Sequence, residues 1–159
     1  GYGVNPDGLM RLAIDAARRG IAKGQSPFGC AISMNGNVIA ATHNVVLLTT
    51  DSTAHAEISA LREACRAIGD VHLTGAHVAT TCEPCPMCMA ALHWARVETV
   101  YYGATIADAA AGGFNELHLP AAEVLRLGRS EVRLVPGVLA DECRALFGDW
   151  ASSPGARAY

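Results

Sequence analysis

The sequence predicts a single α/β domain built on a mixed β-sheet with helices packed against it. Residues 28–34 and 38–42 flank Asn35-Gly36, a dipeptide typical of tight β-hairpin turns. Downstream of this hairpin, short apolar runs alternate with segments of helical periodicity, a pattern typical of strands joined by helices. A chain of 159 residues can form one hydrophobic core. Because an antiparallel hairpin precedes the alternating segments, we expect a mixed sheet.

The remaining elements follow from the same periodicities and from turn residues. We expect, in chain order, a helix over 6–23, the hairpin, a loop over 45–50, a helix over 53–68, a strand over 76–81, a helix over 84–96, a strand over 98–103, a helix over 120–127, a strand over 131–135 and a helix over 139–150. Asp51 or Ser52 is the expected N-cap of the helix over 53–68, and Gly69 ends that helix. The expected domain spans residues 4–151, and residues 152–159 form a tail.

Composition limits the partners of this chain. Apolar residues make up 51% of it and charged residues 17%, so we expect an oligomer that buries part of an apolar surface. The net charge is −3, the only lysine is Lys23 and the arginines are scattered, which argues against nucleic-acid binding. No apolar stretch is long enough to cross a membrane. Six cysteines without a disulfide pattern fit a reduced cytoplasm.

One pair of motifs carries the predicted chemistry. His55-Ala56-Glu57 is followed by Pro84-Cys85-Pro86-Met87-Cys88, which together provide one imidazole, two thiolates and one carboxylate. Three ligands, His55, Cys85 and Cys88, would leave the fourth tetrahedral position of Zn²⁺ open for water. Zinc lowers the pKa of bound water, and Glu57 is the expected base and proton shuttle. The pattern H-x-E…P-C-x-x-C is a signature of zinc nucleobase deaminases.

Other interpretations of the same cysteines remain open. A closed structural zinc site would need a fourth ligand, for which Cys82 is the nearest candidate, but it lies in an expected strand and leaves Glu57 without a role. A redox dithiol and a zinc-stabilised interaction module are further alternatives. Glu83 is expected to be a cap near the cysteine helix, the helix over 84–96 that carries Cys85 and Cys88, rather than to act in catalysis.

Several motifs across residues 9–117 resemble the cytidine-deaminase-like superfamily, and within it the bacterial guanine deaminases. The motifs are Ser26-Pro27-Phe28-Gly29, Asn44-Val45, Thr53-Ala54-His55-Ala56-Glu57, the run Thr81-Cys82-Glu83-Pro84-Cys85-Pro86-Met87-Cys88, Trp94-Ala95, Asp108-Ala109-Ala110 and Gly113-Phe114. The resemblance implies a three-layer α/β/α sandwich around a five-stranded sheet, and one zinc ion per subunit. It also implies a homodimer, often with an exchanged C-terminal segment, so that the tail 152–159 can reach the neighbouring subunit.

The resemblance also implies roles for substrate-binding residues. The implied substrate is a small heterocycle, with guanine converted to xanthine. Asn44 would pair with the purine edge, Ala56 and Glu57 would line the bound base, Phe28 and Trp94 would form walls, Glu116 would accept hydrogen bonds from guanine, and Tyr159 would reach a neighbouring site.

The C-terminal third departs from this pattern. Residues 135–143 look more like the tRNA-editing branch, so a tRNA adenosine deaminase is an alternative, as is a deaminase of an aminated triazine or of another nucleobase or nucleoside. Affinity for RNA rests largely on lysine and arginine contacts to phosphates, which this chain is poorly equipped to make.

The cysteine helix predicts a homodimer, because its apolar residues cover more than one face. Pairing with a second copy would bury the face that does not meet the sheet. The alternative is that the C-terminal helix, residues 139–150, covers this face within one chain.

Overall fold

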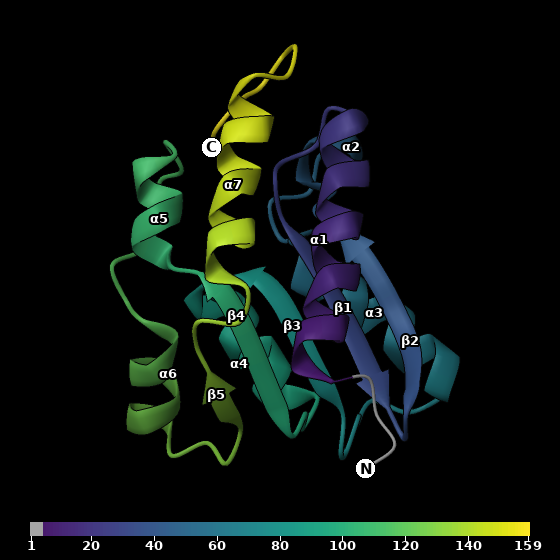
Figure 1. The fold of residues 1–159 in the computed structure, drawn as a ribbon. Helices are drawn as coiled ribbons and strands as arrows, with labels where there is room; N and C mark the ends of the chain where they lie inside the picture. Colours follow the sequence, from purple (N-terminus) through teal and green to yellow (C-terminus); the bar gives the residue numbers. More distant parts are fainter. Residues whose placement is uncertain (1–4) are drawn as a thin grey trace.

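The structure is a computed structural model that describes residues 5–159, so the expected domain start at residue 4 lies outside the described residues. After an initial helix and hairpin, each further strand is separated from the next by one or two helices (Figure 1). In chain order they are α1 (Pro6–Ala22), β1 (Gly29–Met34), β2 (Asn37–His43), α2 (Val46–Thr49), α3 (Ala56–Ile68), β3 (His77–Cys82), α4 (Pro86–Trp94), β4 (Thr99–Ala104), α5 (Ile106–Ala111), α6 (Ala121–Gly128), β5 (Arg133–Val135) and α7 (Ala140–Ala151).

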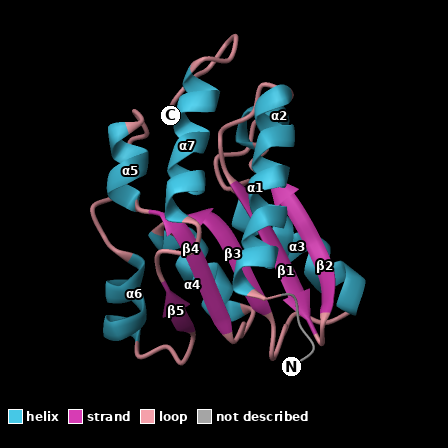
Figure 2. Ribbon diagram, in the orientation of Figure 1, coloured by secondary structure: helices cyan, strands magenta, loops and turns pink. Residues whose placement is uncertain are grey.

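The five strands form one mixed sheet in the order β2-β1-β3-β4-β5 (Figure 2). Strand β1 is antiparallel to both of its neighbours, whereas β3, β4 and β5 are parallel. The hairpin turn has φ of 54° at Asn35 and 79° at Gly36, the positive values that favour an Asn-Gly pair. The predicted mixed five-stranded sheet is therefore confirmed, with β2 at one edge.

Alternating side chains of the strands form two cores, one on each face of the sheet. On β3 and β4, Val78 and Val100 face one side, while Ala79 and Tyr101 face the other. The first side packs against α3, α4 and α6, and the second packs against α1 and α7 (Figure 1). This arrangement is the predicted three-layer α/β/α sandwich. It also shows that α7 lies on the opposite side of the sheet from α4, so the expectation that the C-terminal helix could cover α4 is wrong.

Two helix starts and two short helices differ from the sequence prediction. Helix α3 begins at Ala56 rather than near residue 53, because Asp51 is used in a turn, where its carboxylate accepts hydrogen bonds from the backbone N–H and the hydroxyl of Thr53. Helix α4 begins at Pro86, which leaves Pro84 outside the helix. The expected loop over 45–50 contains the single turn of α2.

The short helix α5 was not predicted, although Thr105 and Asp108 form a capping box at its start. Six residues rich in alanine are too few to show a helical period. Among residues 5–159, no helix combines the length and the apolar character that a membrane crossing requires.

Candidate metal centre and active-site pocket

Two helix N-termini converge on the predicted metal ligands. His55 is the N-cap of α3 and Cys85 is the N-cap of α4, with nearly equal backbone angles of φ −63°, ψ 162° and φ −64°, ψ 168°. Cys88 follows in the first turn of α4, where Pro86 is tolerated because its missing N–H is not needed for the helix ladder. The positive end of each helix dipole favours thiolates at these positions.

The distances between the ligand atoms fit a tetrahedral zinc ion. His55 Nδ1 lies 3.7 Å from Cys85 Sγ and 3.5 Å from Cys88 Sγ. Zinc bonds of about 2.3 Å to sulfur and about 2.0–2.1 Å to nitrogen at tetrahedral angles give an N···S separation of about 3.6 Å. All three ligand atoms lie within 4.8 Å of one another, and the group contains no further His, Cys, Asp or Glu among the described residues. Cys82 is therefore not a fourth ligand of a closed site.

The thiols differ in their protonation. The hydrogen bond with Cys88 and the contact with His55 outweigh burial and together lower the pKa of Cys85 to about 4. The same hydrogen bond and burial raise the pKa of Cys88. Burial lowers the pKa of His55, but the hydrogen bond with Cys85 and the charge of Glu57 outweigh it, so the net pKa is raised. One thiolate is thus present before a cation joins the group.

Glu57 lies beside the ligands as the second residue of α3. Its side chain is 6% exposed and is in hydrogen-bonding contact with Cys88. Burial raises the pKa of this carboxyl to about 7, while the charge of His55 acts in the opposite direction. A carboxylate in this place can take a proton from a molecule bound at the open metal position and return it.

A pocket of about 190 Å³ opens in front of this group. It brings together seven of the predicted site residues: Phe28, Asn44, His55, Glu57, Cys85, Glu116 and Tyr159. These residues come from six separate parts of the chain, namely the start of β1, the end of β2, the two helix N-termini and the segments after α5 and α7. Strand β3 is parallel to β4, and β1 runs antiparallel to β2 in the hairpin. The start of β1 and the ends of β2, β3 and β4 therefore lie at the same end of the sheet.

Asn44 and Tyr159 meet inside this pocket. Asn44 is 1% exposed, and its Oδ1 accepts a hydrogen bond of 3.0 Å from the backbone N–H of Val46. The amide nitrogen, Nδ2, is thereby directed away from that turn and donates a 2.6 Å hydrogen bond to the Tyr159 hydroxyl. The tail is also anchored by a hydrogen bond from the Asn115 N–H to the Tyr159 carbonyl. Tyr159 thus reaches the pocket of its own chain.

Aromatic rings form one wall of the pocket. The Phe28 ring meets the Phe114 ring edge to face with centroids 4.9 Å apart, and Phe114 meets Tyr159 in the same way at 5.5 Å. The Tyr159 ring lies 6.5 Å from the imidazole of His55. Glu116 follows Phe114 in the same loop, and burial, together with the charge of Cys85, raises the pKa of its carboxyl. A flat ring entering this pocket would therefore contact phenyl rings and a carboxyl group.

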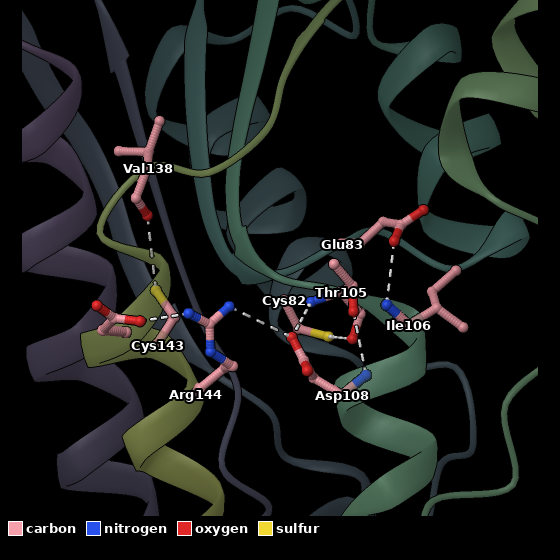
Figure 3. Close-up of polar contacts among 9 residues, drawn as sticks. Cys82, Glu83, Thr105, Ile106, Asp108, Val138, Cys143 and Arg144 are labelled. Carbon is pink, nitrogen blue, oxygen red and sulfur yellow. Dashed lines mark hydrogen bonds and ion pairs between the residues drawn. The ribbon is translucent and has the colours of Figure 1, made fainter.

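Glu83 lines the pocket and connects two helices, and Figure 3 shows its contact with Ile106 at the start of α5. Its two carboxylate oxygens accept hydrogen bonds from the first N–H groups of two helices, Ile106 of α5 at 3.0 Å and Ala121 of α6 at 2.9 Å. The neighbouring Cys82 is buried, with its Sγ 3.6 Å from the carbonyl oxygen of Thr105. Glu83 is therefore a cap, as expected, but it caps α5 and α6 rather than the cysteine helix.

Two predicted pocket residues lie elsewhere. Trp94 is 71% exposed at the end of α4, where the guanidinium of Arg96 stacks on its ring at 5.8 Å. Nine residues of helix place it about 13 Å along the axis from Cys85, too far to form a pocket wall in the same chain. Ala56 is fully buried, and its side chain packs into the core between α3 and the sheet. Its expected contact with the base is therefore not made by the side chain.

Four pocket residues were not predicted as site residues: Cys82, Glu83, Phe114 and Asn115. Phe114 and Asn115 directly precede Glu116, so the loop signal was available in the sequence. Cys82 and Glu83 precede the cysteine motif, and their place in the pocket follows from strand β3 ending beside the metal ligands.

The geometry defines a class of protein: a hydrolase in which a zinc-binding triad and a buried carboxylate act on the C–N bond of a cyclic amidine. Residues 5–104 match the model of the cytidine and deoxycytidylate deaminase zinc-binding region. The chain belongs to this deaminase family and is a zinc-dependent deaminase.

Relatives within this family act on different substrates. The chain is 40% identical over 114 residues to guanine deaminase of Bacillus subtilis, which covers 71% of this chain and 73% of the relative. It is 37% identical over 138 residues to the tRNA-specific adenosine deaminase of the same organism, covering 87% and 83%. The solved structure of guanine deaminase from Nitrosomonas europaea superposes with a TM-score of 0.84 at 29% identity, covering 92% of this chain and 85% of that one.

Proposed function

We propose that this deaminase converts guanine and water to xanthine and ammonia. The observation that carries the proposal is the small, partly acidic pocket that Asn44, Glu116 and Tyr159 line together with the metal-ligand group. Its volume of about 190 Å³ is below the range of roughly 300–1,000 Å³ typical of pockets for drug-sized ligands, which favours a bare nucleobase. The 40% identity to a guanine deaminase supports the same substrate.

The polar groups of the pocket complement the guanine edge. A carboxylate at Glu116 can accept hydrogen bonds from the N–H groups of the ring, and the Asn44 amide can donate to a ring acceptor. Phe28 and Phe114 provide apolar contact for a flat heterocycle. A polar site of this kind discriminates strongly against rings that leave its hydrogen-bonding groups unpaired.

Glu57 performs the proton transfers in this proposal. Bound zinc supplies a Lewis acid that acidifies water. As the water oxygen forms a bond to C2 of guanine, Glu57 accepts the water proton and delivers it to the adjacent ring nitrogen. It then relays the second proton, from the new hydroxyl on C2, to the exocyclic amine. The bond between C2 and the exocyclic nitrogen breaks, ammonia leaves, and the C2 carbonyl of xanthine forms. The position of Glu57 beside Cys88 suits both transfers.

A substrate panel tests the proposal. Guanine, adenine, cytosine, their nucleosides, an anticodon stem-loop RNA and an aminated triazine are compared by ammonia release. We expect guanine to have the highest kcat/KM. An inert guanine together with efficient turnover of another ring would contradict the substrate assignment while leaving the deaminase class intact.

The tRNA alternative has support from several relatives that are tRNA adenosine deaminases, one of which covers 87% of this chain. In this structure Tyr159 lines the pocket and its hydroxyl accepts a hydrogen bond from Asn44, which leaves a volume of about 190 Å³ that suits a bare ring better than a nucleotide within RNA. We therefore favour a small heterocycle as the partner of this site.

We infer that the protein acts as a homodimer through the outer face of α4. Met87, Ala90 and Trp94 are exposed along this face, and Trp94 is 71% exposed. An apolar helix face of this kind is typical of protein interfaces. The expectation that the tail 152–159 reaches the neighbouring subunit remains a prediction. All six cysteines are free thiols, which is consistent with the predicted cytoplasmic location.

A further inference from the structure

A basic groove runs along the free edge of strand β2. Helix α1 lies on one face of the sheet and α3 on the other, so their side chains flank this edge from both sides (Figure 1). Residues from α1, β2 and α3, together with Lys23 and Val45, line an open groove of about 550 Å³, and none of them lines the active-site pocket. The groove is thus a second concave site, separate from the metal centre.

The groove gathers cations that are distant in the sequence. Arg19 and Lys23 approach it from α1, and Arg62 and Arg66 approach it from α3. These four belong to the twelve lysines and arginines of a chain whose net charge is −3. Glu63 is the single acid among the described residues that line the groove. The arginines are scattered in the sequence, but the fold brings some of them together.

These cations are largely free to bind a ligand. Arg62 lies 3.7 Å from the carboxylate of Asp51. Within residues 5–159, no ion pair involves Arg19, Lys23 or Arg66. Residues four apart on a helix are neighbours, so Arg62 and Arg66 lie side by side on α3, while Lys23, the C-cap residue of α1, follows Arg19 by four positions. An anion between the helices could therefore contact both pairs.

Helix-end electrostatics explain only part of this arrangement. Arg19 and Arg66 lie in the last turns of their helices, where a cation stabilises the helix dipole by about 0.3–1 kcal/mol. That effect would be the same on any side of the helix. It accounts neither for Arg62, which lies in the middle of α3, nor for the meeting of both cation pairs at one edge strand.

We propose that this groove binds the phosphate chain of a small nucleotide or an inorganic polyphosphate. Arginine and lysine are the side chains that proteins use for phosphate oxygens, and the volume lies in the range of small-molecule sites. Single-stranded RNA is less well matched, because such sites stack bases on aromatic rings. His43 provides the one aromatic ring among the described lining residues.

The floor of the groove is continuous with the segments that carry the active site. The Thr42 hydroxyl donates a 3.0 Å hydrogen bond to the carbonyl of Ala56 at the start of α3. His43 Nδ1 lies 2.9 Å from the carbonyl oxygen of Asn44. A bound phosphate chain would thus lie on the outer side of the residues that hold Asn44 and Glu57.

Calorimetric titration of the zinc-loaded protein with inorganic triphosphate at about 50 mM salt tests this site. We expect one bound triphosphate per chain, and Arg19→Gln/Arg66→Gln should weaken binding at least about tenfold. The matched control is Arg11→Gln/Arg18→Gln, which removes two exposed cations of α1 outside the groove and should change binding less than about twofold. Equal weakening in both double variants, or the absence of binding, would overturn the proposal.

Three further ligands separate the possible sources of the phosphate chain. Adenosine triphosphate should bind and compete with inorganic triphosphate, whereas adenosine should not bind. A single-stranded ten-nucleotide RNA should bind no more tightly than the triphosphate, and much tighter RNA binding would contradict a site for a small ligand. Zinc content is measured after each titration, because triphosphate could produce heat by removing zinc from the protein instead of binding to the groove. Such heat would be the same in all variants, and this result would contradict the proposed site.

Discussion

The side-chain amide of Asn44 donates a 2.6 Å hydrogen bond to the phenol oxygen of Tyr159, 115 residues further along the chain. Asn44 is the residue expected to pair with the purine edge, and in this structure one of its two amide N–H groups is bonded to Tyr159. A substrate that pairs with Asn44 would use the second N–H or displace the Tyr159 hydroxyl from the first.

This relationship predicts the effect of removing one hydroxyl group. In Tyr159→Phe the ring keeps its contact with Phe114, but the Asn44 amide loses its partner. One hydrogen bond is worth about 0.5–1.5 kcal/mol, so KM for guanine should fall by about two- to tenfold with kcat nearly unchanged. Steady-state kinetics measure this, with Tyr102→Phe outside the pocket as the control. A higher KM would show that the hydroxyl helps to bind substrate.

Mutation can distinguish the role of the Glu57 carboxylate from the role of the metal ligands. Glu57→Gln keeps the three ligands and nearly the same volume, so we expect normal zinc content and thermal stability. Turnover should fall by several orders of magnitude, because both proton transfers depend on the carboxylate. Zinc analysis, thermal melting and ammonia release are measured on the same preparation. Activity near that of the original protein would remove Glu57 from the mechanism.

Zinc content distinguishes the ligand thiols from the neighbouring buried thiol. Cys88→Ser should lose zinc, activity and thermal stability together, because metal binding and folding are coupled. Cys82→Ser should retain one zinc ion per chain, since Cys82 lies outside the group formed by His55, Cys85 and Cys88. Elemental analysis after dialysis against a weak chelator gives the stoichiometry. Loss of zinc from both variants would support a closed four-ligand site.

Glu83 gives a prediction about stability. In Glu83→Gln one carboxylate oxygen becomes an NH₂ group that cannot accept the hydrogen bond from Ile106 or Ala121. An unsatisfied buried N–H costs about 1–3 kcal/mol, and we expect the free energy of unfolding to fall by this amount. Urea denaturation measures the change, with the exposed Glu131→Gln as a neutral control. An unchanged stability would mean that α5 and α6 do not depend on this cap.

The sequence predicted the metal group well because its signal is local. His55 and Glu57 are two residues apart, and Cys85 and Cys88 are three apart, so each pair keeps its geometry once its helix forms. The pocket walls depend on long-range packing instead. Trp94 was assigned to a wall through the resemblance, whereas the length of α4 carries it to the surface. Phe114 enters the pocket with the loop that carries Glu116, whereas Glu83 enters it because α5 and α6 pack at the end of β3, which no local pattern encodes.

The same distinction applies to charge. Lys23 and Arg66 are 43 residues apart, and only the position of β2 at the sheet edge brings their helices to one groove. A scattered distribution in the sequence therefore does not exclude a basic surface on the folded chain.

The last prediction concerns assembly through α4. Met87, Ala90 and Trp94 are exposed on the helix that begins at the metal, and α7, which lies across the sheet, leaves them uncovered. A closed pair of chains would bury this face, since two-fold dimers are the commonest closed assembly. Sedimentation equilibrium at micromolar concentration should therefore give about twice 16.6 kDa. Trp94→Glu should shift the mass toward one chain, because a charge would be buried in the interface. Val38→Glu, at an exposed apolar position on β2, should leave the mass unchanged. A fully active monomer would contradict both the dimer and the reach of the tail 152–159 into a neighbouring subunit.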